Sequence, residues 1–430
     1  MIDQPLDTNG VPLRGGPQRG DRVLVAMSGG VDSSVAAALL VEQGCDVVGV
    51  TMKLHADGSD VPDRPCCSLD STSDARRVCE KLGVPHYVVN LVDQFGHDVL
   101  DDFVQEYARG RTPIPCVRCN TFTKFHDLLR KADAIDAHWL ATGHYARMGD
   151  VHGQRALLRG LDPAKDQSYF LWGIDRSVLD RLVLPIGVQT KPETREIARR
   201  FGLRTAEKPE SQDICFVPDG NHVRVLEEQL GMDAPALSAG PLRMHTGEVI
   251  GEHTGFARFT VGQRKGLPGG FAEPMFVVEI IASERAVIIG PRDALLGRGL
   301  EARELNWLAA PPATGARVQV QVRNRARAVG ATVVRFEHDS IELALEEPVA
   351  AISPGQSLVL FDGVHVLGGG VIERGMRDGG MSDGGMRDGG MRDGGMRDGG
   401  MRDGGMGDDR SPAPGATAAA KRASLPILAA

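Results

Sequence analysis

Two cysteines three positions apart, Cys116 and Cys119, lie in the proline-rich segment TPIPCVRCN. A C-x-x-C of this kind is compatible with half of a zinc site, a thiol–disulfide redox pair, two ligands of an iron–sulfur cluster or a catalytic thiolate. No second pair of ligands follows at the spacing of a zinc ribbon, and the two prolines are atypical of a thioredoxin motif. A further thiol, Cys215, lies in SQDICF among polar residues, although a lone cysteine is often simple core packing.

A second chemically capable segment, SGGVDSS, spans residues 28–34 between a short apolar run and a helical pattern. Its glycines let backbone amides approach a phosphate, its serines add hydroxyl donors, and the helix that follows directs its positive end at the same place. Asp32 would cap that helix or hold a Mg²⁺ ion bound to the phosphates. The segment lacks the G-x-x-x-x-G-K-[ST] pattern, so it is not a Walker A loop.

Two further polar segments follow. ATGHY (141–145) is expected at the end of a strand, where open α/β sheets bind ligands, and it carries Gly143 and His144. DPAKDQSYFL (162–171) combines a turn with Lys165, Asp166 and Gln167, and taken alone it is also compatible with an ordinary polar loop.

The elements that must position these residues alternate between strands and helices in the first half of the chain. Strands are expected at 22–27, 46–52, 86–91 and 138–143, and helices after SGGVDSS and at 71–83, 97–110 and 122–137. Strands that alternate with helices favour β-α-β crossovers and a parallel sheet. The first part is therefore an α/β domain.

Beyond about residue 220 the pattern becomes β-rich, with glycine-containing turns, and predicts a small barrel. From Met376 to Met406 a five-residue unit, M-R/S-D-G-G, repeats; it matches neither helix nor strand. We therefore expect five parts: a disordered lead-in (1–20), the α/β catalytic domain (21–220), a small central domain (221–295), a C-terminal β-barrel (296–372) and a low-complexity disordered tail (373–430).

Composition limits the function classes. The chain has 430 residues and a formal charge of −8, so any nucleic-acid binding must come from a local basic face. The N-terminal segment has no apolar core of signal-peptide length and no run approaches the roughly 18 apolar residues of a membrane span, which predicts no membrane association. The seven cysteines are odd in number and unevenly spaced, which favours a reducing cytoplasm over a disulfide scaffold.

Taken together, several motifs resemble those of the tRNA-specific 2-thiouridylases, which belong to the pyrophosphate-loop ATP pyrophosphatases. The similarity runs from about residue 21 to residue 372, in family order, through SGGVDSS, the C-x-x-C-N segment, ATGHYAR, LLRGLDPxKDQSYFL, SQDICF and TVGQRKGL. The resemblance implies a pyrophosphate-loop domain, a small central domain and a C-terminal β-barrel, in agreement with the α/β-then-β pattern.

The resemblance also implies a reaction and its partners. ATP adenylates the C2 oxygen of the wobble uridine in the anticodon stem-loop of tRNAs for Lys, Glu and Gln, and a cysteine persulfide then delivers sulfur. Cys215 matches the persulfide carrier, loaded by an upstream sulfur carrier or cysteine desulfurase. Cys119 matches a second thiol that releases sulfide or leaves a Cys119–Cys215 disulfide. Arg118 and the amides of a helix after Asn120 are the nearby groups that would lower the pKa of Cys119.

Binding residues carry over in the same way. The resemblance implies an ATP site that comprises Ala26, Met27, Ser28, Gly29, Gly30, Val31, Asp32, Ser33, Met52 and Gly143. It implies tRNA contacts at His144, Lys165, Asp166, Gln167, Arg323, Asn324, Arg325 and Gln356. Asn324 takes the place of an aromatic residue that the family usually has between two basic residues.

One position departs from the common family pattern. Many members carry Asp, thought to be a proton shuttle, where this chain has Cys116, and a subset shares the C-x-x-C. Cys116, Cys119 and Cys215 would then supply three thiolates to an iron–sulfur cluster whose open iron binds sulfide. The sequence is compatible with both mechanisms, the persulfide relay and the iron–sulfur cluster. Another pyrophosphate-loop ligase and a non-catalytic RNA-binding protein are the remaining alternatives.

Overall fold

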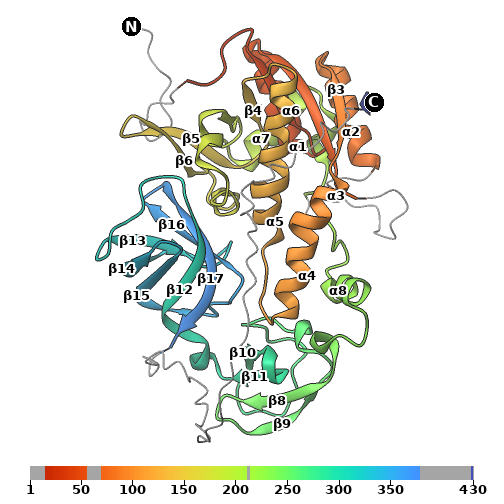
Figure 1. Ribbon diagram of the computed structural model, residues 1–430. Coiled ribbons are helices and arrows are strands. Elements are labelled where there is room, and N and C mark those ends of the chain that lie inside the picture. The colour runs from red at the N-terminus through yellow and green to blue at the C-terminus, as the bar shows by residue number, and fades with distance from the viewer. Residues whose placement is uncertain (1–14, 56–68, 211–213, 378–427, 430) are drawn as a thin grey trace, which may run out of the picture.

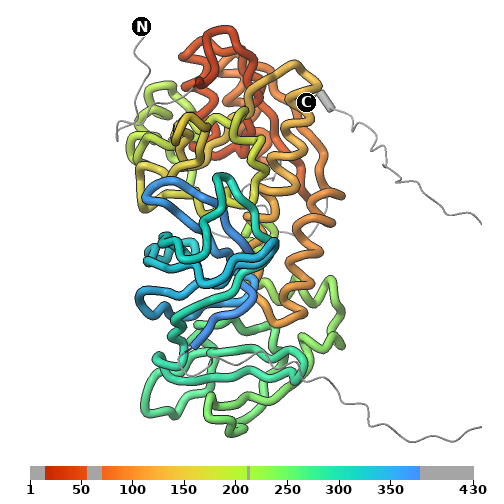
Figure 2. Tube along the Cα trace, turned by 60° about the vertical axis from the view of Figure 1, so that its left-hand side comes forward, coloured from red at the N-terminus to blue at the C-terminus, as the bar shows by residue number. Residues whose placement is uncertain are grey.

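The computed structural model describes residues 15–55, 69–210, 214–377 and 428–429. The expectations for residues 1–14 and for the M-R/S-D-G-G repeats after residue 377 lie outside these ranges. The molecule is elongated, with the α/β domain at one end, the central domain at the other and the barrel alongside (Figure 1). Turned by 60°, the trace shows the blue barrel between the red-to-yellow α/β domain and the green central domain (Figure 2).

The α/β domain is built on the parallel sheet that the sequence predicts. Its strands lie in the order β18-β3-β2-β1-β4-β7. The parallel strands are β3 (His86–Asn90), β2 (Asp46–Lys53), β1 (Arg22–Ala26), β4 (Trp139–Ala141) and β7 (Leu182–Val183). β1 is buried along four of its five residues, as expected of a central strand covered on both faces. The two-residue β18 (Leu428–Ala429), within the tail expected to be disordered, pairs antiparallel with β3.

The helices of this domain cover the sheet, and two of them extend away from it beside the barrel (Figure 1). α1 (Val31–Gln43), α2 (Leu69–Leu82) and α7 (Lys191–Arg200) pack near the sheet. One long helix joins α3 (Val92–Phe95), a π-helical turn (Gly96–Leu100) and α4 (Asp101–Ala108). The other joins α5 (Pro115–Arg118), a π-helical stretch (Cys119–Phe125) and α6 (His126–Ala134), and we call this helix, residues 115–134, the thiol helix.

The thiol helix starts earlier than the sequence suggests. We expected a helix from residue 122, preceded by a segment that two prolines interrupt. In the structure the helix begins at Pro115, and Cys116 and Cys119 both lie within it. Proline is compatible with the first helical position, because its missing N–H would have no partner there and its φ is already helical.

The β-rich part divides into two sheets. After α8 (His222–Leu230), the central domain has a four-stranded sheet in the order β10-β11-β8-β9. These strands span Phe276–Ile281, Ala286–Gly290, Gly240–Met244 and Val249–His253. The barrel follows the order β12-β15-β14-β13-β16-β17, and pairing of β12 with β17 closes it. Its strands span Leu296–Trp307, Ser340–Ala350, Val329–Glu337, Arg317–Gln321, Ser357–Asp362 and His365–Met376, so β17 continues four residues past the expected end at 372.

The α/β domain also contributes a hairpin to the barrel sheet, which the sequence does not indicate. β5 (Ala146–Val151) and β6 (Gln154–Arg159) pair with each other, and Leu158 of β6 pairs with His365 of β17. The main hydrophobic cluster likewise contains residues of the α/β domain, the central domain and the barrel, for example Phe103, Val277 and Phe361. The three parts therefore share one core.

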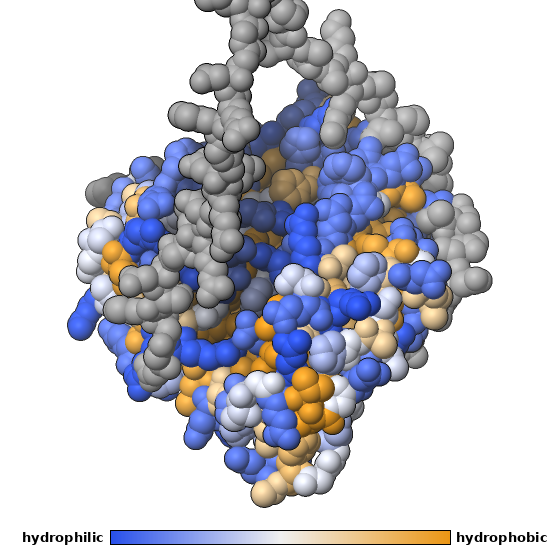
Figure 3. Space-filling model, turned by 60° about the horizontal axis from the view of Figure 1, so that its bottom comes forward, coloured by the Kyte–Doolittle hydropathy of each residue, from blue (hydrophilic) through white to orange (hydrophobic). Residues whose placement is uncertain are grey.

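Within the described residues, no helix is both long and apolar enough to cross a membrane. Viewed from the central-domain end, the surface is largely hydrophilic, with smaller hydrophobic patches between the polar residues (Figure 3).

Candidate functional site: a glycine-rich loop and a thiol helix

The glycine-rich loop lies between β1 and α1, at the carboxyl edge of the sheet. The Ser33 hydroxyl accepts from the amide of Ser28 at 3.1 Å, and the Ser34 hydroxyl donates to the carbonyl of Gly30 at 2.7 Å. Gly29 has a φ of +69°, and a Cβ there would lie 2.1 Å from the carbonyl oxygen of Ser71. Among the described residues, a Cβ on Gly30 would meet only the Ser28 hydroxyl, at 3.4 Å. The space above Gly30, at the start of α1, is therefore open to a ligand.

The other residues expected at the ATP site lie around this loop. Gly143 touches it, because a Cβ there would be 2.5 Å from the amide nitrogen of Ser33. Ala26 ends β1 and Met27 follows it, and both are buried, whereas Met52 lies half-buried near the end of the adjacent β2. The structure thus brings together, from three strand ends, the residues that the sequence assigns to one nucleotide site.

Two lysines that the sequence analysis missed contact the loop. Lys191, which is 8% exposed, donates to both carboxylate oxygens of Asp32 at 2.7 and 2.9 Å, and it also pairs with Glu210 at 3.1 Å. Lys208 donates to the carbonyl of Gly29 at 3.1 Å and to Asp74 at 2.8 Å. Each lysine begins the sequence K-P-E, and this repeated tripeptide is the signal that could have drawn attention to them.

Tyr145 completes this network. Its hydroxyl donates to Asp32 at 3.0 Å and lies 2.9 Å from the hydroxyl of Thr194 on α7. Burial first, and then the negative charge of Asp32, raise the pKa of Tyr145, so the phenol stays protonated at neutral pH.

The residues present fit ATP better than they fit a metal ion. The open space above Gly30, the amides at the start of α1 and two nearby lysines match a polyphosphate. Asp32, which we expected to cap α1 or to hold Mg²⁺, makes no side-chain cap bond, and its carboxylate instead binds Lys191 and Tyr145. As placed, it does not offer a Mg²⁺ site, and we derive no step through that ion.

The thiol helix holds Cys116 and Cys119 in different environments. Cys116 is exposed, whereas Cys119 is half-buried and packs against the main core cluster. Cys215, also half-buried, packs against that same cluster. The next residue on the helix, Asn120, is buried and donates to the carbonyl of Phe170 at 2.9 Å.

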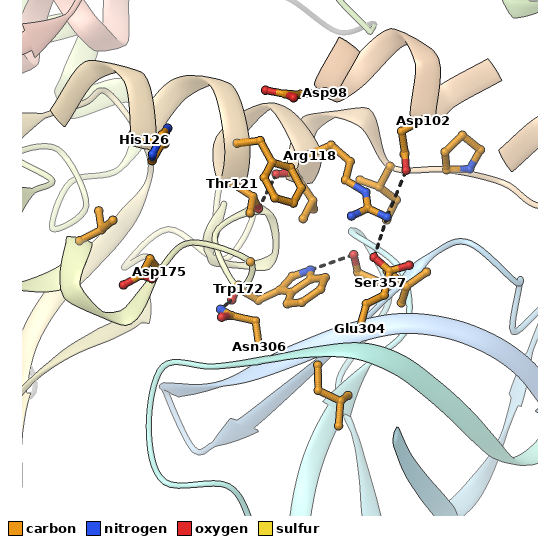
Figure 4. A pocket seen from close by; sticks show the side chains of 18 of the residues that line it. Asp98, Asp102, Arg118, Thr121, His126, Trp172, Asp175, Glu304, Asn306 and Ser357 are labelled. Atoms are coloured by element: carbon orange, nitrogen blue, oxygen red, sulfur yellow. Dashed lines mark hydrogen bonds and ion pairs between the residues drawn. The ribbon is translucent and has the colours of Figure 1, made fainter. Parts of the chain in front are cut away.

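Two expectations about activation of Cys119 need correction. Arg118 pairs with Asp102 at 3.1 Å and with Glu304 of the barrel at 2.8 Å, so its charge is already balanced by carboxylates (Figure 4). The helix N-terminus is also not adjacent to Cys119. Because the helix starts at Pro115, its first-turn amides begin at Cys116, which is the cysteine nearer to the positive end of the helix.

As placed, the described cysteines form neither a metal site nor a disulfide. Within the described residues, no group of three or more His, Cys, Asp or Glu side chains is placed to hold a metal ion, so Cys116, Cys119 and Cys215 do not fit an iron–sulfur cluster as they stand. No disulfide joins the five cysteines in the described ranges. Cys66 and Cys67 lie outside these ranges.

The residues expected to contact tRNA from the α/β domain are mostly engaged inside the protein. His144 lies with its Nδ1 2.7 Å from the Thr142 hydroxyl, and burial lowers its pKa well below the usual value. Lys165 pairs with Glu210 at 2.6 Å. Asp166 accepts from the backbone amides of Gly160 and Ser168, and Gln167 accepts from the amide of Tyr145. Asp166 and Gln167 therefore order the loop that carries them.

The barrel residues expected to contact tRNA lie in different environments. Arg323, Asn324 and Arg325 are exposed in the loop between β13 and β14, and the carbonyls of the first two accept from the buried Gln321 side chain at 3.1 and 2.7 Å. Gln356 instead donates to the carbonyl of Thr112 at 2.8 Å. The loop thus presents its charged groups to solvent, whereas Gln356 joins the barrel to the segment before the thiol helix.

A groove of about 860 Å³ lies between the thiol helix, α4 and the barrel. Val117, Arg118, Thr121 and Phe122 line it from the thiol helix, and Glu304 and Asn306 line it from the barrel (Figure 4). Neither cysteine of the thiol helix belongs to this lining. Trp172 also borders the groove, with its indole N–H donating to the Ser357 hydroxyl at 2.8 Å.

A parallel sheet with a glycine-rich loop at its carboxyl edge is joined here to two β-rich modules, and the family model that matches the first part places it in the HUP class. Three family models match in order: a tRNA methyl transferase HUP domain over residues 21–219, a tRNA methyl transferase PRC-barrel domain over 235–291 and an aminomethyltransferase β-barrel domain over 297–372.

Similar proteins identify the family within this class. The tRNA-specific 2-thiouridylase MnmA of Geobacter metallireducens is 48% identical over 364 residues, which cover 83% of this chain and 97% of the relative. That of Geotalea uraniireducens is 46% identical over 359 residues, covering 82% and 95%. This chain belongs to the tRNA-specific 2-thiouridylase family. A solved 4-thiouridine synthetase–RNA complex with bound ATP aligns over 49% of this chain and 51% of its own, at 20% identity and a TM-score of 0.31, which supports no functional argument.

Proposed function

We propose that this protein is a tRNA-uridine 2-sulfurtransferase, which uses ATP to convert the C2 oxygen of a wobble uridine in tRNA to sulfur. The main support is family membership over most of the chain, with relatives named tRNA-specific 2-thiouridylase. The observation that carries the ATP-dependent part is the open glycine-rich loop, which Gly143, Lys191 and Lys208 surround.

In the first step the uridine C2 oxygen attacks the α-phosphorus of ATP, and the bond to the β-phosphate oxygen breaks. The products are an O-adenylated uridine and pyrophosphate. The loop amides and Lys208 bind the phosphates, because they place positive charge where the leaving pyrophosphate accumulates negative charge. Because the loop is already formed, its donors do not have to reorganise during the reaction, and this lowers the activation barrier of the adenylation step.

In the second step a persulfide on Cys215 supplies the sulfur. Cys119 attacks the inner sulfur of this persulfide, a Cys119–Cys215 disulfide forms and hydrosulfide leaves. Hydrosulfide then adds to C2 and expels AMP. A thiol reductant restores both cysteines, and an upstream sulfur carrier or cysteine desulfurase reloads Cys215. The assignment of Cys119 and Cys215 as partners is supported by their match to the two thiols of the family motifs.

The substrate is the anticodon stem-loop of tRNAs for Lys, Glu and Gln, in the cytoplasm. Anticodon bases are single-stranded, so the wobble uridine can leave its stack and enter the site. The exposed Arg323 and Arg325 support phosphate contacts from the barrel, because charged side chains directed to solvent bind a backbone without disturbing the fold.

The test is an in vitro assay with ATP, tRNA and a persulfide donor, followed by nucleoside mass spectrometry. The parent chain should form 2-thiouridine and release one pyrophosphate per product. Cys215→Ser should lose product formation by a factor on the order of 10³ and still bind ATP. Cys45→Ser is the control and should retain activity, because this half-buried cysteine follows the end of α1 that is opposite to the glycine-rich loop. Undiminished thiolation by Cys215→Ser would refute the role of this cysteine.

The same assay separates the relay from the cluster alternative. Cys116→Asp restores the carboxylate that many family members carry, so the relay predicts an active enzyme. A cluster that needs Cys116 as a ligand predicts an inactive one. Anaerobic purification with iron and acid-labile sulfide assays provides the second readout, and an active, iron-free protein would exclude the cluster.

A further inference from the structure

The start of the thiol helix has no cap of its own. Ile114 occupies the N-cap position and makes no side-chain cap bond, and Pro115 follows it. A helix whose first turn has no capping side chain depends on contacts from outside to fix its first residues. Both cysteines, Cys116 and Cys119, lie within the first two turns of this helix.

The barrel holds the segment immediately before the helix. The amide of Thr112 donates to the carbonyl of Pro354 at 2.8 Å, and the carbonyl of Thr112 accepts from the side chain of Gln356 at 2.8 Å. Gly355, between them, has a φ of +87°, and a Cβ there would lie 2.9 Å from the amide nitrogen of Thr112. Arg111 adds a 2.7 Å ion pair with Glu373 of β17.

The barrel also contacts the helix itself, through Glu304. Its carboxylate lies 2.8 Å from the guanidinium of Arg118, the residue that precedes Cys119 (Figure 4). Glu304 has a φ of +51° and lies where the β12–β17 register shifts, between Arg303 and Asn306. A left-handed conformation is costly for a residue with a Cβ, and such strain persists where the surrounding structure requires it.

Neighbouring contacts keep Glu304 in this position. Asn306, on the same irregular part of β12, donates to the carbonyls of Trp172 and Ile174 at 2.6 and 2.9 Å. On another side of the thiol helix, Asn120 is held by the carbonyl of Phe170. The helix is therefore fixed between the α/β domain and the barrel, and Glu304 is the strained barrel residue that pairs with the helix.

We infer that Glu304 is a positioning residue for sulfur transfer: through its ion pair with Arg118 it fixes the rotation and translation of the thiol helix, and so the place of Cys119. Adjacent helical residues project about 100° apart, so rotation of Arg118 moves Cys119 with it. The inference rests on the proposed function. The barrel would then have two functions, which are to contact tRNA and to hold the thiol helix in place.

The sharpest variant is Glu304→Gly. Glycine adopts a positive φ without strain, so this change removes the anchor and relieves the backbone at once. We expect an unfolding midpoint no lower than that of the parent chain, together with a thiolation rate at saturating ATP that is reduced about 10- to 100-fold. The ATP KM should stay at the parental value, because the glycine-rich loop belongs to the α/β domain and Glu304 belongs to the barrel. A merely structural role would lower the midpoint and the rate together, and that result overturns the inference.

Two comparisons make the test specific. Arg118→Met should lose at least as much, because it also removes the 3.1 Å pair with Asp102, and the double variant should be no worse than Arg118→Met alone, since the Glu304 pair is already absent there. Additive losses would contradict the pairing. Glu346→Gln is the matched control, because Glu346 forms an exposed barrel ion pair with Arg317, at 3.7 Å, away from the helix.

A readout without activity separates this inference from the proposed function. Alkylation of Cys119 by iodoacetamide, followed by mass spectrometry, should be faster in Glu304→Gly than in the parent and unchanged in Glu346→Gln. An unchanged Cys119 rate in Glu304→Gly would overturn the positioning role. If the parent chain does not thiolate tRNA, the proposed function fails, and the alkylation comparison still decides whether Glu304 holds the helix.

Discussion

At the scale of single residues, the glycine-rich loop depends on lysines that lie far away in sequence. Lys191 and Asp32 are 159 positions apart, and Lys208 and Gly29 are 179 positions apart. Lys208 is the more direct partner of the loop, because it binds a loop carbonyl. The ammonium group of Lys208 also forms an ion pair with Asp74 at 2.8 Å. The ammonium group donates to Gly29, Ser71 and Asp74, so it would have to exchange one of these partners for a phosphate oxygen when a triphosphate binds.

Lys208→Met should therefore weaken ATP binding. We expect the ATP KM to rise roughly 10- to 100-fold, which corresponds to the 1.5–3 kcal/mol typical of a hydrogen bond to a charged group. Steady-state pyrophosphate release measures this change. Lys81→Met, which replaces an exposed lysine near the end of α2, is the control. An ATP KM unchanged in Lys208→Met would argue against phosphate binding by this lysine.

The same residues explain what the sequence could and could not predict. The segment SGGVDSS and its strand–loop–helix setting are local, so their pattern in the chain suffices. The Asp32–Lys191 pair depends on tertiary packing, which no local pattern encodes. The helix start at Pro115 was missed for another reason, since a proline interrupts a helix in its interior but suits its first position.

At the scale of elements, the loop between β13 and β14 presents Arg323 and Arg325 to solvent, while Gln321 holds its backbone from below. A loop with a fixed backbone and exposed guanidinium groups can meet a phosphate backbone without first being ordered. The net charge of −8 makes such a local basic surface necessary for RNA binding.

Replacing Arg323 and Arg325 by alanine should weaken tRNA binding more at low salt than at high salt. The slope of log K against log salt should become shallower by about one to two, since each phosphate contact contributes roughly 0.7 to 0.9. Filter binding across a salt series measures it. Arg335→Ala, on the same barrel but paired with Glu337 and Glu342, should leave the slope unchanged.

His86, in β3 where it pairs with β2, is an acid-sensitive residue. Burial, with a smaller effect of Arg76, lowers the pKa of His86 from 6.5 to about 4, and its Nε2 lies 2.9 Å from the Thr51 hydroxyl. Between about pH 6.5 and pH 4 the unfolded chain binds a proton there that the native chain does not. The free energy of unfolding should therefore fall as the pH is lowered through this window.

Urea unfolding at pH 7 and pH 5 checks this prediction. His86→Gln should reduce the loss of stability between the two values, because the depressed group is gone. His97→Gln, whose side chain is 83% exposed, should leave the difference as it is. An equal loss in the parent and in His86→Gln would contradict the assignment.

At the scale of the whole molecule, the three parts are not independent units on linkers. The β5–β6 hairpin extends the barrel sheet, the main hydrophobic cluster crosses all three parts, and Arg111 pairs with both Glu106 and Glu373. The sequence predicts the order of the parts but not these contacts, because each one joins segments whose separation in the chain exceeds any local pattern.

We expect one cooperative thermal transition, with calorimetric and van't Hoff enthalpies that agree, although chains of several domains often unfold in steps. Differential scanning calorimetry measures this. Arg111→Met should lower the midpoint and broaden the transition, because it removes both ion pairs at the junction. Two resolved transitions in the parent chain would show that the barrel unfolds by itself.

The attachment of Thr112 to Gln356 has a consequence for biosynthesis. The two residues are 244 positions apart, and translation at roughly 5–20 residues per second leaves about 12 to 50 s between them. During that interval the nascent segment that carries Cys116 and Cys119 lies outside the ribosome without the contacts that later hold it. Completion of the barrel therefore ends the period in which the segment that carries both thiols is unattached, although Cys116 stays exposed in the folded chain.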